Sequence, residues 1–422
     1  MNRPVVGFAG LTHLGVNSAA AAAAKGFQVV GFHPDPPRVQ ALTAGRSPYT
    51  EPGLEALLAE HAQRLSFAAE ANALSACDLV YLAVDVPTDD QGRSDLEPIS
   101  AMIAAVLPAM KPGAALVILC QVPPGFTRAL ALPPEAVFYQ VETLVFGQAV
   151  ERALAPERFI VGAARPDRPL HPALERFLAA FDCPVLPMAY ESAELAKISI
   201  NMVLAATVTT ANVMAELCEQ VGADWLEIAP ALKLDRRIGP YSYLTPGLGL
   251  SGGNIERDLA TVARLSALHG ADQEVVTAWT ANSARRKAWP LDILRTQLLD
   301  RDPVARVAVL GLAYKQDTNS TKNAPSLVLI EGLREPFALY DPQAPSAAAG
   351  PLARPAPSAL AAAEGADAVC IMTPWAEFRD LDPAALAQAM RGTLVIDPYR
   401  VLNAARAAEA GLSVFRLGAQ AC

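Results

Sequence analysis

The segment GLGLSGGNIERD, residues 247–258, combines residue types that could bind a ligand closely. It places five glycine or serine residues before the amide of Asn254 and ends on the charged pair Arg257 and Asp258. A stretch with so few side chains lets backbone amide groups approach a ligand. The Asn254 side chain donates and accepts hydrogen bonds, but its amide nitrogen has no available lone pair and cannot act as a nucleophile. The segment therefore predicts a binding loop.

A second glycine-containing segment, GLTHLG at residues 10–15, follows a short apolar run. It fits the dinucleotide-binding fingerprint at the first and third glycines but carries Thr12 at the middle position, where the backbone approaches the pyrophosphate. An anion would still meet the N-terminus of the next helix, whose free N–H groups and dipole favour negative charge. Binding then requires that the cofactor shifts or that the Thr12 side chain turns away. We expect this turn to bind the cofactor through Gly10, Thr12, His13, Leu14 and Gly15.

The end of the second strand decides how a dinucleotide ribose is held. An acidic residue usually takes the ribose hydroxyls there, but this chain has His33, followed by Pro34 and Asp35. His33 could equally be a surface loop residue, and Arg38 either meets a 2′-phosphate or is a solvated helix charge. The choice between NAD and NADP stays open, with NAD as the expected cofactor. The other cofactor-binding candidates are His33, Asp35, Arg38, Val86 and Gln121.

Composition excludes several classes of protein. The 422 residues carry a net charge of −9, and the basic residues form no stripe, which argues against nucleic acid as a partner. We find no stretch of about 18 strongly apolar residues and no signal peptide, so we expect a cytoplasmic protein that does not span a membrane. The six cysteines lack paired metal-site spacing, so we expect free thiols and no metal.

Apolar runs alternating with helical segments predict an α/β fold. After the opening strand, turn, helix and strand, buried strands are expected at residues 78–84, 114–120, 136–141 and 158–163, which indicates a parallel, doubly wound sheet. A second α/β unit begins at residue 306. We interpret its Pro/Ala-rich stretch 342–357 as a surface loop.

Residues 190–222 predict one long helix, with apolar residues at three- and four-residue steps and no proline. We interpret it as the spine between domains and a dimer surface. Helical patterns continue to about residue 290. The expected architecture is two Rossmann-like domains with parallel doubly wound sheets, joined by the long helix and a helical middle domain. The domains are expected at 1–189 (dinucleotide-binding), 190–295 (helical, dimerisation) and 296–422 (nucleotide-sugar-binding).

The order of eight motifs resembles the UDP-glucose/GDP-mannose dehydrogenase family over nearly the whole chain. These are GLTHLG, AVDVPTDDQGRSDL, VPPGFT, ERFIVG, AELAKISINMVLA, DRRIGPYSYLTPGLGLSGG, GLAYKQDTNSTKNAPS and TPWAEF. The resemblance implies NAD on the N-terminal domain, a nucleotide sugar, expected to be UDP-linked in this chain, and a homodimer formed through the long helix. Family members oxidise the C6 alcohol of the sugar to a carboxylate with two NAD and no metal, through a cysteine thioester.

This chain departs from the family at the chemical centre. Asn254 stands where the family has its cysteine, which closes the covalent route. Gln121 replaces a hydroxyl that positions water, Thr207 replaces a lysine, and Lys322 replaces an arginine and loses its bidentate fork. We therefore expect removal of a single hydride, with an aldehyde or ketone as product. An aldehyde that hydrates could be oxidised again, which would give the acid slowly.

Family roles carry over to residues that this chain retains. Lys197 and Asn201 lie four apart on the long helix, as the oxyanion-stabilising pair of the family does. Glu142 and Asp258 match acids that assist proton transfer, although Asp258 could instead cap the helix that begins near RDLATVARL. With Asn254, these residues are the catalytic candidates. The substrate-binding candidates are Arg237, Tyr243, Gly249, Gly252, Gly253, Arg257, Lys315 and Lys322.

Two other functions remain open. A catalytically silent relative that binds a nucleotide sugar or a partner enzyme fits the several altered positions. An epimerase that retains NAD and returns the hydride to its substrate is the third alternative.

Overall fold

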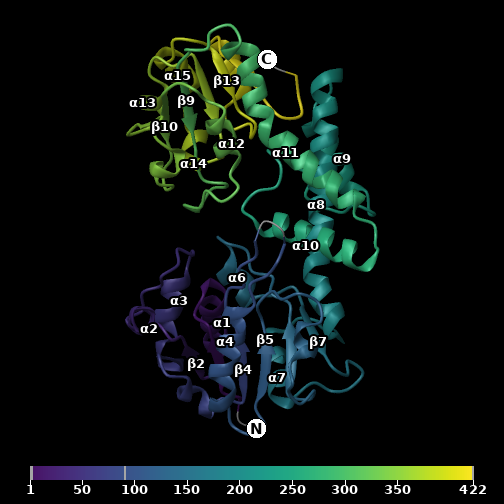
Figure 1. Cartoon of the computed structure of the whole chain (residues 1–422). Coiled ribbons are helices and arrows are strands. Elements are labelled where there is room, and N and C mark those ends of the chain that lie inside the picture. The colour runs from purple at the N-terminus through teal and green to yellow at the C-terminus, as the bar shows by residue number, and fades with distance from the viewer. Residues whose placement is uncertain (1–2, 90–91, 421–422) are drawn as a thin grey trace. The chain divides into compact units, whose positions relative to one another are not determined.

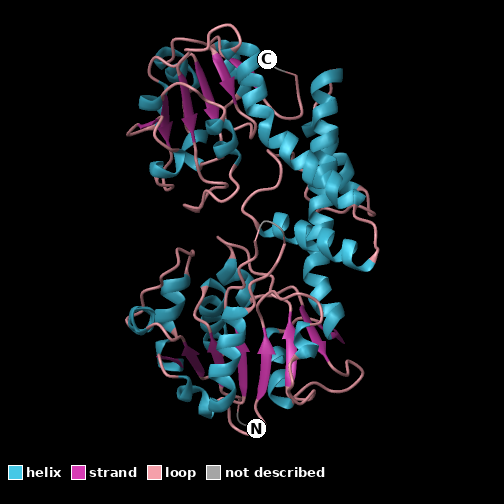
Figure 2. Cartoon of the chain, in the orientation of Figure 1, coloured by secondary structure: helices cyan, strands magenta, loops and turns pink. Residues whose placement is uncertain are grey.

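The computed structural model describes residues 3–89 and 92–420, and the chain divides into two compact units, Met1–Ile200 and Asn201–Cys422. Each unit contains one sheet with helices packed against it (Figures 1 and 2). The α/β class and the long helix are confirmed. The division into three domains stays a prediction.

The first unit is built on an eight-stranded sheet in the order β3-β2-β1-β4-β5-β6-β7-β8. Strands β1 to β6 run parallel, whereas β7 pairs antiparallel with β6 and parallel with β8. The doubly wound sheet is thus parallel through β6 and reverses direction at the β6/β7 pair. The strands are β1 (Val6–Ala9), β2 (Val29–Phe32), β3 (Leu65–Ala68), β4 (Leu79–Leu82), β5 (Ala115–Ile118), β6 (Val137–Gln140), β7 (Phe159–Ala163) and β8 (Val185–Ala189).

Helices connect these strands and cover both faces of the sheet. Strands β1, β4 and β5 are buried along their whole length, which explains their nearly continuous apolar sequences. The strand order reverses between β1 and β4, so a ligand crevice is expected at their carboxyl ends. The helices are α1 (His13–Ala24), α2 (Pro36–Thr43), α3 (Leu54–Glu60), α4 (Glu97–Val106), α5 (Phe126–Ala129), α6 (Ala149–Leu154) and α7 (Pro172–Leu178).

Helix α8 (Tyr190–Val221) crosses the boundary between the two units and reproduces the predicted helix almost to the residue. By length and composition it is apolar enough to cross a membrane, and 33% of its most apolar stretch is buried in the protein. In the second unit it is followed by α9 (Trp225–Leu234), α10 (Asn254–His269) and α11 (Glu274–Leu294).

The second unit also holds a fully parallel six-stranded sheet in the order β11-β10-β9-β12-β13-β14. Its strands are β9 (Val307–Leu310), β10 (Phe337–Tyr340), β11 (Ala353–Pro355), β12 (Ala368–Ile371), β13 (Leu394–Ile396) and β14 (Ser413–Phe415). Its helices are α12 (Pro325–Glu331), α13 (Ala359–Ala363), α14 (Ala376–Arg379), α15 (Pro383–Ala389) and α16 (Ala404–Glu409).

The prediction that residues 342–357 form only a surface loop was wrong. This stretch contains a short 3₁₀ turn, Ser346–Ala349, and the edge strand β11, which pairs with β10. The strand escapes sequence analysis because it is three residues long and ends in proline, which is compatible with a sheet edge only. Its pairing comes from the neighbouring strand and not from its own apolar pattern.

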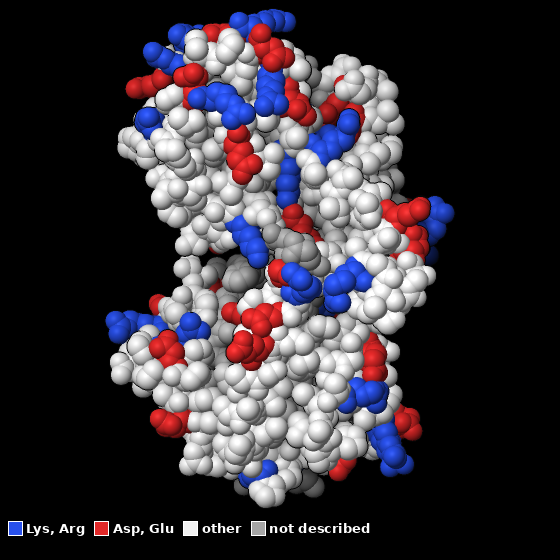
Figure 3. Space-filling model, in the orientation of Figure 1, with Lys and Arg blue, Asp and Glu red and all other residues white. Residues whose placement is uncertain are grey.

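The face of the molecule drawn in Figure 3 carries charged side chains of both signs. On the face drawn in Figure 3, basic and acidic side chains are interspersed and form no stripe of one sign. Such a surface offers no track for a polyanion on that face.

Candidate active site

The turn after β1 has the backbone of a dinucleotide-binding loop. Gly10 has a φ of +97°, and a Cβ atom there would lie 2.7 Å from the carbonyl oxygen of Ala83. A Cβ atom on Gly15 would lie 1.9 Å from the carbonyl oxygen of Gly10. Any larger residue at either position would therefore push the turn apart. The two glycines close the turn at the end of β1, next to the carboxyl end of β4.

Thr12, the residue at the middle glycine position, is held inside this turn. Its hydroxyl donates to the carbonyl oxygen of Ala83 at 2.7 Å and accepts the N–H of Gly15 at 3.3 Å, which makes Thr12 the N-cap of α1. Its side chain thus points into the turn. No described group accepts the N–H of His13 or Leu14, so these donors at the N-terminus of α1 suit a pyrophosphate. The turn fits NAD despite the lost glycine.

His13 is fixed by contacts that the sequence did not predict. Its Nε2 lies 2.8 Å from a carboxylate oxygen of Glu51, and its ring stacks on Phe146 at 4.1 Å between centroids. Glu51 also accepts the N–H groups of Gly147 (3.1 Å) and Ala149 (2.8 Å). The buried carboxylate therefore ties the first residue of α1 to the start of α6.

His33, Arg38 and Tyr49 lie close together near the end of β2, where the ribose of a dinucleotide is expected to bind. Nη1 of Arg38 lies 3.2 Å from Nε2 of His33, 3.2 Å from the hydroxyl of Tyr49 and 3.3 Å from the carbonyl oxygen of Leu11. Asp35 is the N-cap residue of α2 but makes no side-chain capping bond. Arg38 is thus half-buried and directed at the dinucleotide turn, so its interpretation as a merely solvated charge does not hold. Tyr49 is a site residue that the sequence analysis missed.

Two other cofactor candidates follow neighbouring strands. Val86 comes after β4 and Gln121 after β5, and both are half-buried. Asp85, immediately before Val86, was not predicted. Burial raises the pKa of its carboxyl, while Arg38 and His13 lower it in part.

Glu142 and Lys197 are the two catalytic candidates that lie in the first unit. Glu142 lies just after β6, its Oε2 is 3.7 Å from Nζ of Lys197 on α8, and the two side chains are 21% and 17% exposed. Glu142 also accepts the N–H of Leu144. The structure thus brings together two residues that are 55 positions apart, and both keep limited access to solvent.

Glu194, which the sequence analysis missed, anchors the loop that precedes α5. It is fully buried, and its carboxylate accepts the N–H groups of Gly125 (2.5 Å) and Thr127 (2.9 Å). Burial raises the pKa of this carboxyl, partly offset by those hydrogen bonds. Since Glu194 lies one turn before Lys197, it fixes the VPPGFT loop to the helix that carries the lysine. An acid in an otherwise apolar helical face was the signal that could have revealed it.

In the second unit, Asn201 and Asp258 pair directly. Nδ2 of Asn201 donates to Asp258 at 2.6 Å, and Nε of Arg257 donates to the other carboxylate oxygen at 3.1 Å. The interpretation of Asp258 as a helix cap was wrong. Helix α10 begins at Asn254 with Gly253 as its N-cap residue, which places Asp258 in the second turn with its side chain fully buried. Its partners are side chains and not the free N–H groups of a helix end.

The glycine-rich loop requires glycine at three positions. Gly249, Gly252 and Gly253 have φ values of +75°, +85° and +96°. Added Cβ atoms would lie 2.4 Å from the carbonyl oxygen of Ser283, 2.5 Å from the ring of Tyr314 and 3.0 Å from the Lys322 side chain, respectively. The loop therefore packs against α11 and the segment after β9. The loop ends at the exposed Asn254, which is the first residue of α10.

The remaining substrate candidates lie on exposed or half-buried loops. Arg237 is 89% exposed and bonded to Asp235, and Tyr243 is 58% exposed. Lys315 lies over the ring of Tyr314 at 5.7 Å, and the backbone carbonyl of Lys322 accepts the N–H of Gly252 at 3.2 Å. Lys315 and Lys322 thus lie beside the glycine-rich loop.

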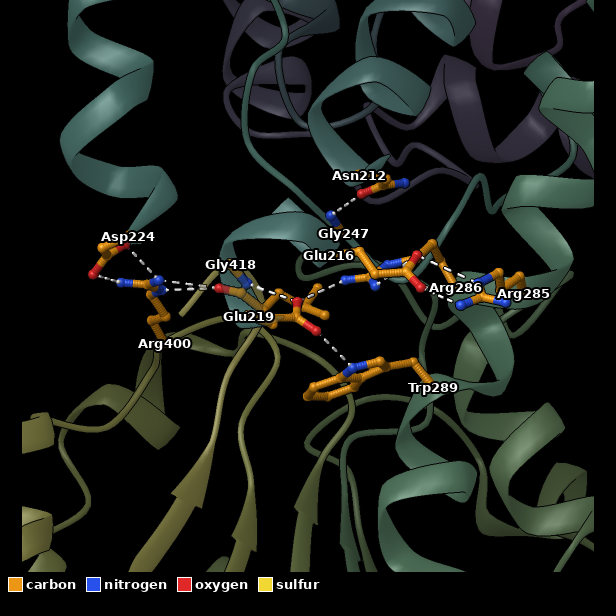
Figure 4. A network of polar contacts seen from close by, with 11 residues as sticks. Asn212, Glu216, Glu219, Asp224, Gly247, Arg285, Arg286, Trp289, Arg400 and Gly418 are labelled. Atoms are coloured by element: carbon orange, nitrogen blue, oxygen red, sulfur yellow. Dashed lines mark hydrogen bonds and ion pairs between the residues drawn. The ribbon is translucent and has the colours of Figure 1, made fainter. Parts of the chain in front are cut away.

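A partly buried polar network joins the helices of the second unit to its sheet domain (Figure 4). Glu219 on α8 accepts hydrogen bonds from Arg286 (3.1 Å) and Trp289 (3.2 Å) on α11 and from the N–H of Gly418 (2.9 Å). Asp224 caps α9 and pairs with Arg400 at 2.8 Å. These contacts hold the helical part and the parallel sheet of this unit as one body.

None of the five described cysteines has the environment of a nucleophile. Burial raises the pKa of Cys77, Cys120 and Cys370 to about 12, and it also raises the pKa of Cys183 and Cys218. All five are free thiols. A nucleophilic cysteine needs a lowered pKa, so these thiols stay protonated near neutral pH. Within residues 3–89 and 92–420, no cluster of three His, Cys, Asp or Glu side chains could hold a metal ion.

Comparison with known proteins identifies the chain. The family descriptions for UDP-glucose/GDP-mannose dehydrogenases match it in order: the NAD binding domain at residues 5–176, the central domain at 191–284 and the UDP binding domain at 308–404. A UDP-glucose 6-dehydrogenase from Pseudomonas aeruginosa is 32% identical, over 95% of this chain and 94% of that protein. The chain belongs to the UDP-glucose/GDP-mannose dehydrogenase family. The expected resemblance is thereby confirmed.

Solved structures of this dehydrogenase family have the same fold. A UDP-glucose dehydrogenase from Pyrobaculum islandicum superimposes with a TM-score of 0.85 at 28% identity. The superposition includes 99% of this chain and 98% of the Pyrobaculum chain. A UDP-D-ManNAc dehydrogenase from Pyrococcus horikoshii, at 22% identity and a TM-score of 0.84, supports the fold alone. This family member is therefore an NAD-dependent oxidoreductase that acts on a CH–OH group of a nucleotide sugar.

Proposed function

We propose that this dehydrogenase removes one hydride from a UDP-linked sugar and releases a carbonyl product without a covalent thioester. The alcohol carbon loses hydride to NAD, and the hydroxyl loses its proton to a protein carboxylate, so a primary alcohol gives an aldehyde. NAD supplies the hydride acceptor when bound. The protein supplies orientation, the proton acceptor and stabilisation of the developing negative oxygen.

The observation that carries this proposal is Asn254 at the start of α10. An amide cannot form a thiohemiacetal, and every described cysteine has a pKa raised by burial. Cys120, next to the cofactor candidate Gln121, is the thiol nearest in sequence to the expected cofactor loops, and its pKa is about 12. Neither Asn254 nor these thiols supports covalent capture.

We assign separate roles to the pair of Glu142 and Lys197 and to the pair of Asn201 and Asp258. Lys197 is the cation that stabilises the alkoxide, and Asn201, one turn later on α8, adds a hydrogen-bond donor. Glu142, within 3.7 Å of Lys197 and free of other charged partners among described residues, is the proton acceptor. Asp258 is engaged by Asn201 and Arg257, so its role is to orient the Asn201 amide.

A UDP-linked sugar is the proposed substrate class because the matched relatives are named UDP-glucose 6-dehydrogenases and residues 308–404 match a UDP binding domain. The glycine-rich loop and Lys315 and Lys322 are proposed to bind the nucleotide sugar. Arg237 and Tyr243, both largely exposed, are proposed to contact it as well.

The test is the number of NAD reduced per sugar consumed. The purified protein is incubated with a limiting UDP-sugar and excess NAD, reduced cofactor is measured by absorbance, and the product is identified by mass spectrometry with and without a carbonyl-trapping hydrazine. We expect one equivalent and a trapped carbonyl. Two equivalents with a carboxylate product from the outset would sink the single-hydride proposal.

A second candidate function is a silent nucleotide-sugar-binding relative, favoured by the replacements at Asn254, Gln121 and Thr207. It predicts sugar binding in calorimetry with no reduction of NAD for any UDP-sugar. The retained pair of Glu142 and Lys197 argues against it. An epimerase that retains NAD would instead be purified with bound cofactor and would convert the sugar without net reduction.

We also propose that the protein is a cytoplasmic homodimer formed through α8. Val203, Val213, Leu217 and Val221 on this helix are 50–67% exposed. Their spacing of three to four residues, or multiples of it, places them along one stripe of the helix. Large exposed apolar side chains in such a stripe are typical of an interface and not of a free surface.

A further inference from the structure

The residues around the dinucleotide ribose are unusual for an enzyme that uses NAD alone. In this fold an acidic residue at the end of the second strand binds the ribose hydroxyls, and its charge repels a 2′-phosphate. Here β2 ends at Phe32 and the next residue is His33. The repelling charge is therefore missing at the position where it normally selects NAD.

Arg38 holds a positive charge at this place without a close counter-ion. Its guanidinium lies over the ring of Tyr49 at 5.9 Å, and its Nη1 is directed to neutral oxygens of Leu11 and Tyr49. Among the described residues no carboxylate forms an ion pair with it. A half-buried guanidinium with its remaining N–H groups uncommitted is suited to bidentate binding of a phosphate.

The hydrogen bonds of His33 strengthen this point. Its Nδ1 lies 3.1 Å from the backbone nitrogen of Asp35, and a neutral imidazole has only one accepting nitrogen, so the ring accepts either from Asp35 or from Arg38. Its Nε2 lies 3.2 Å from Nη1 of Arg38, which is a donor. An anionic oxygen placed beside this pair would accept from the Arg38 guanidinium, and also from His33 in the tautomer that has its proton on Nε2.

The charged groups near Arg38 and His33 determine the electrostatic environment of such an anion. Burial and Arg38 lower the pKa of His33, and Asp35 raises it in part. Asp85 is the other acid whose charge reaches Arg38. Helix α2 contributes little, because its first two residues are Pro36 and Pro37 and have no N–H groups to offer. Recognition of an anion here rests on Arg38 and His33.

We infer that the ribose subsite formed by His33, Arg38 and Tyr49 accepts a 2′-phosphate, so that this dehydrogenase binds NADP as well as NAD. The inference deepens the proposed function, since it concerns the cofactor of that same site. The guanidinium of Arg38 holds the phosphate, Nε2 of His33 donates to it, and the Tyr49 ring supports the arginine.

Calorimetry tests this with the whole protein and four ligands: NAD, NADP, 5′-AMP and adenosine 2′,5′-bisphosphate. The last two differ only by the phosphate in question. We expect the bisphosphate to bind at least tenfold more tightly than 5′-AMP and NADP to bind no more weakly than NAD. His33→Asp should shift the ratio of the two cofactor Kd values at least tenfold toward NAD, and Arg38→Met should weaken NADP at least tenfold more than NAD.

Arg46→Met is the matched control, because Arg46 is exposed and lies just after α2, so this variant loses the same charge without touching the subsite. NMR gives an independent readout: the pKa of the His33 imidazole, assigned with His33→Gln, should rise when NADP binds and stay unchanged with NAD.

Binding of NADP at least tenfold weaker than NAD, or equal weakening of both cofactors in Arg38→Met, would overturn the inference while leaving the proposed oxidation intact. Failure of both dinucleotides to bind would overturn the inference and the proposed function together.

Discussion

At the scale of single residues, Asn254 carries our proposal that this chain forms no thioester. It is exposed at the first position of α10, where free backbone N–H groups and the helix dipole stabilise an anion. A thiol at that position would have a lowered pKa, unlike the buried cysteines of this chain. The backbone thus offers a thiolate site that the native side chain cannot use.

We predict that Asn254→Cys gains the covalent route. The number of NAD reduced per sugar should rise from one toward two, and iodoacetamide should return it to one. Asn254→Ser, which is polar and has no thiol, is the control and should stay at one equivalent. The same stoichiometry in both variants would contradict the assignment of this position.

The proposed role of Lys197 can be tested separately from that of Asn254. Loss of a single oxyanion-stabilising donor typically costs about 10²–10³ in rate. We expect Lys197→Met to lower kcat by a factor in that range while KM for NAD stays within about twofold of wild type, because NAD is bound by other residues. Lys111→Met is the control, since Lys111 forms an ion pair with Asp78 and its side chain is 37% exposed. An unchanged kcat in Lys197→Met would exclude Lys197 from the chemistry.

At the scale of elements, the pair of Asp224 and Arg400 joins the start of α9 to the loop after β13. Arg400 has a left-handed φ of 54° and donates to both Asp224 oxygens and to the carbonyl of Leu417. Hydrogen bonding to Arg400 holds the pKa of Asp224 below its usual value. Because the Asp224 side chain is 34% exposed, solvent screens this pair, and its contribution is about 1 kcal/mol.

The pH dependence of unfolding reports on this pair. Because the pKa of Asp224 is lower in the folded state, its stabilisation is complete above the unfolded pKa of about 3.9 and is lost as pH falls through the folded pKa. We predict that Asp224→Asn, which keeps a capping oxygen, lowers the free energy of unfolding by roughly 1 kcal/mol at pH 7 and by less below pH 4. Denaturant unfolding at several pH values measures this, and a pH-independent difference would contradict it.

At the scale of the whole molecule, the exposed apolar stripe of α8 is the surface that we propose as the dimer interface. We predict that Leu217→Glu converts a dimer to a monomer in light scattering at micromolar concentration, because a buried unpaired charge at an interface costs several kcal/mol. Val304→Glu is the matched control, since Val304 is 68% exposed and lies outside α8, in the segment between α11 and β9. A monomeric wild type, or dimers in both variants, would refute the proposed interface.

The sequence by itself determined the elements whose signals are local. Helix α8 was predicted within one residue, since its apolar spacing and lack of proline act along one continuous segment. The buried strands β4, β5, β6 and β7 of the first sheet and the glycine turn after β1 were predicted because their signals are also local. Edge strand β11 was not, because its pairing is supplied by β10.

Only the tertiary structure decided which side chains meet. Lys197 and Glu142 are 55 positions apart and Asn201 and Asp258 are 57 apart, and nothing local specifies either pairing. The sequence left Asp258 as a candidate helix cap. In the structure, α10 begins four residues earlier, at Asn254, where the glycine-rich loop ends. The chain encodes residue types and periods locally, whereas hydrogen bonds between distant segments depend on strand order and helix packing, which no short stretch of sequence contains.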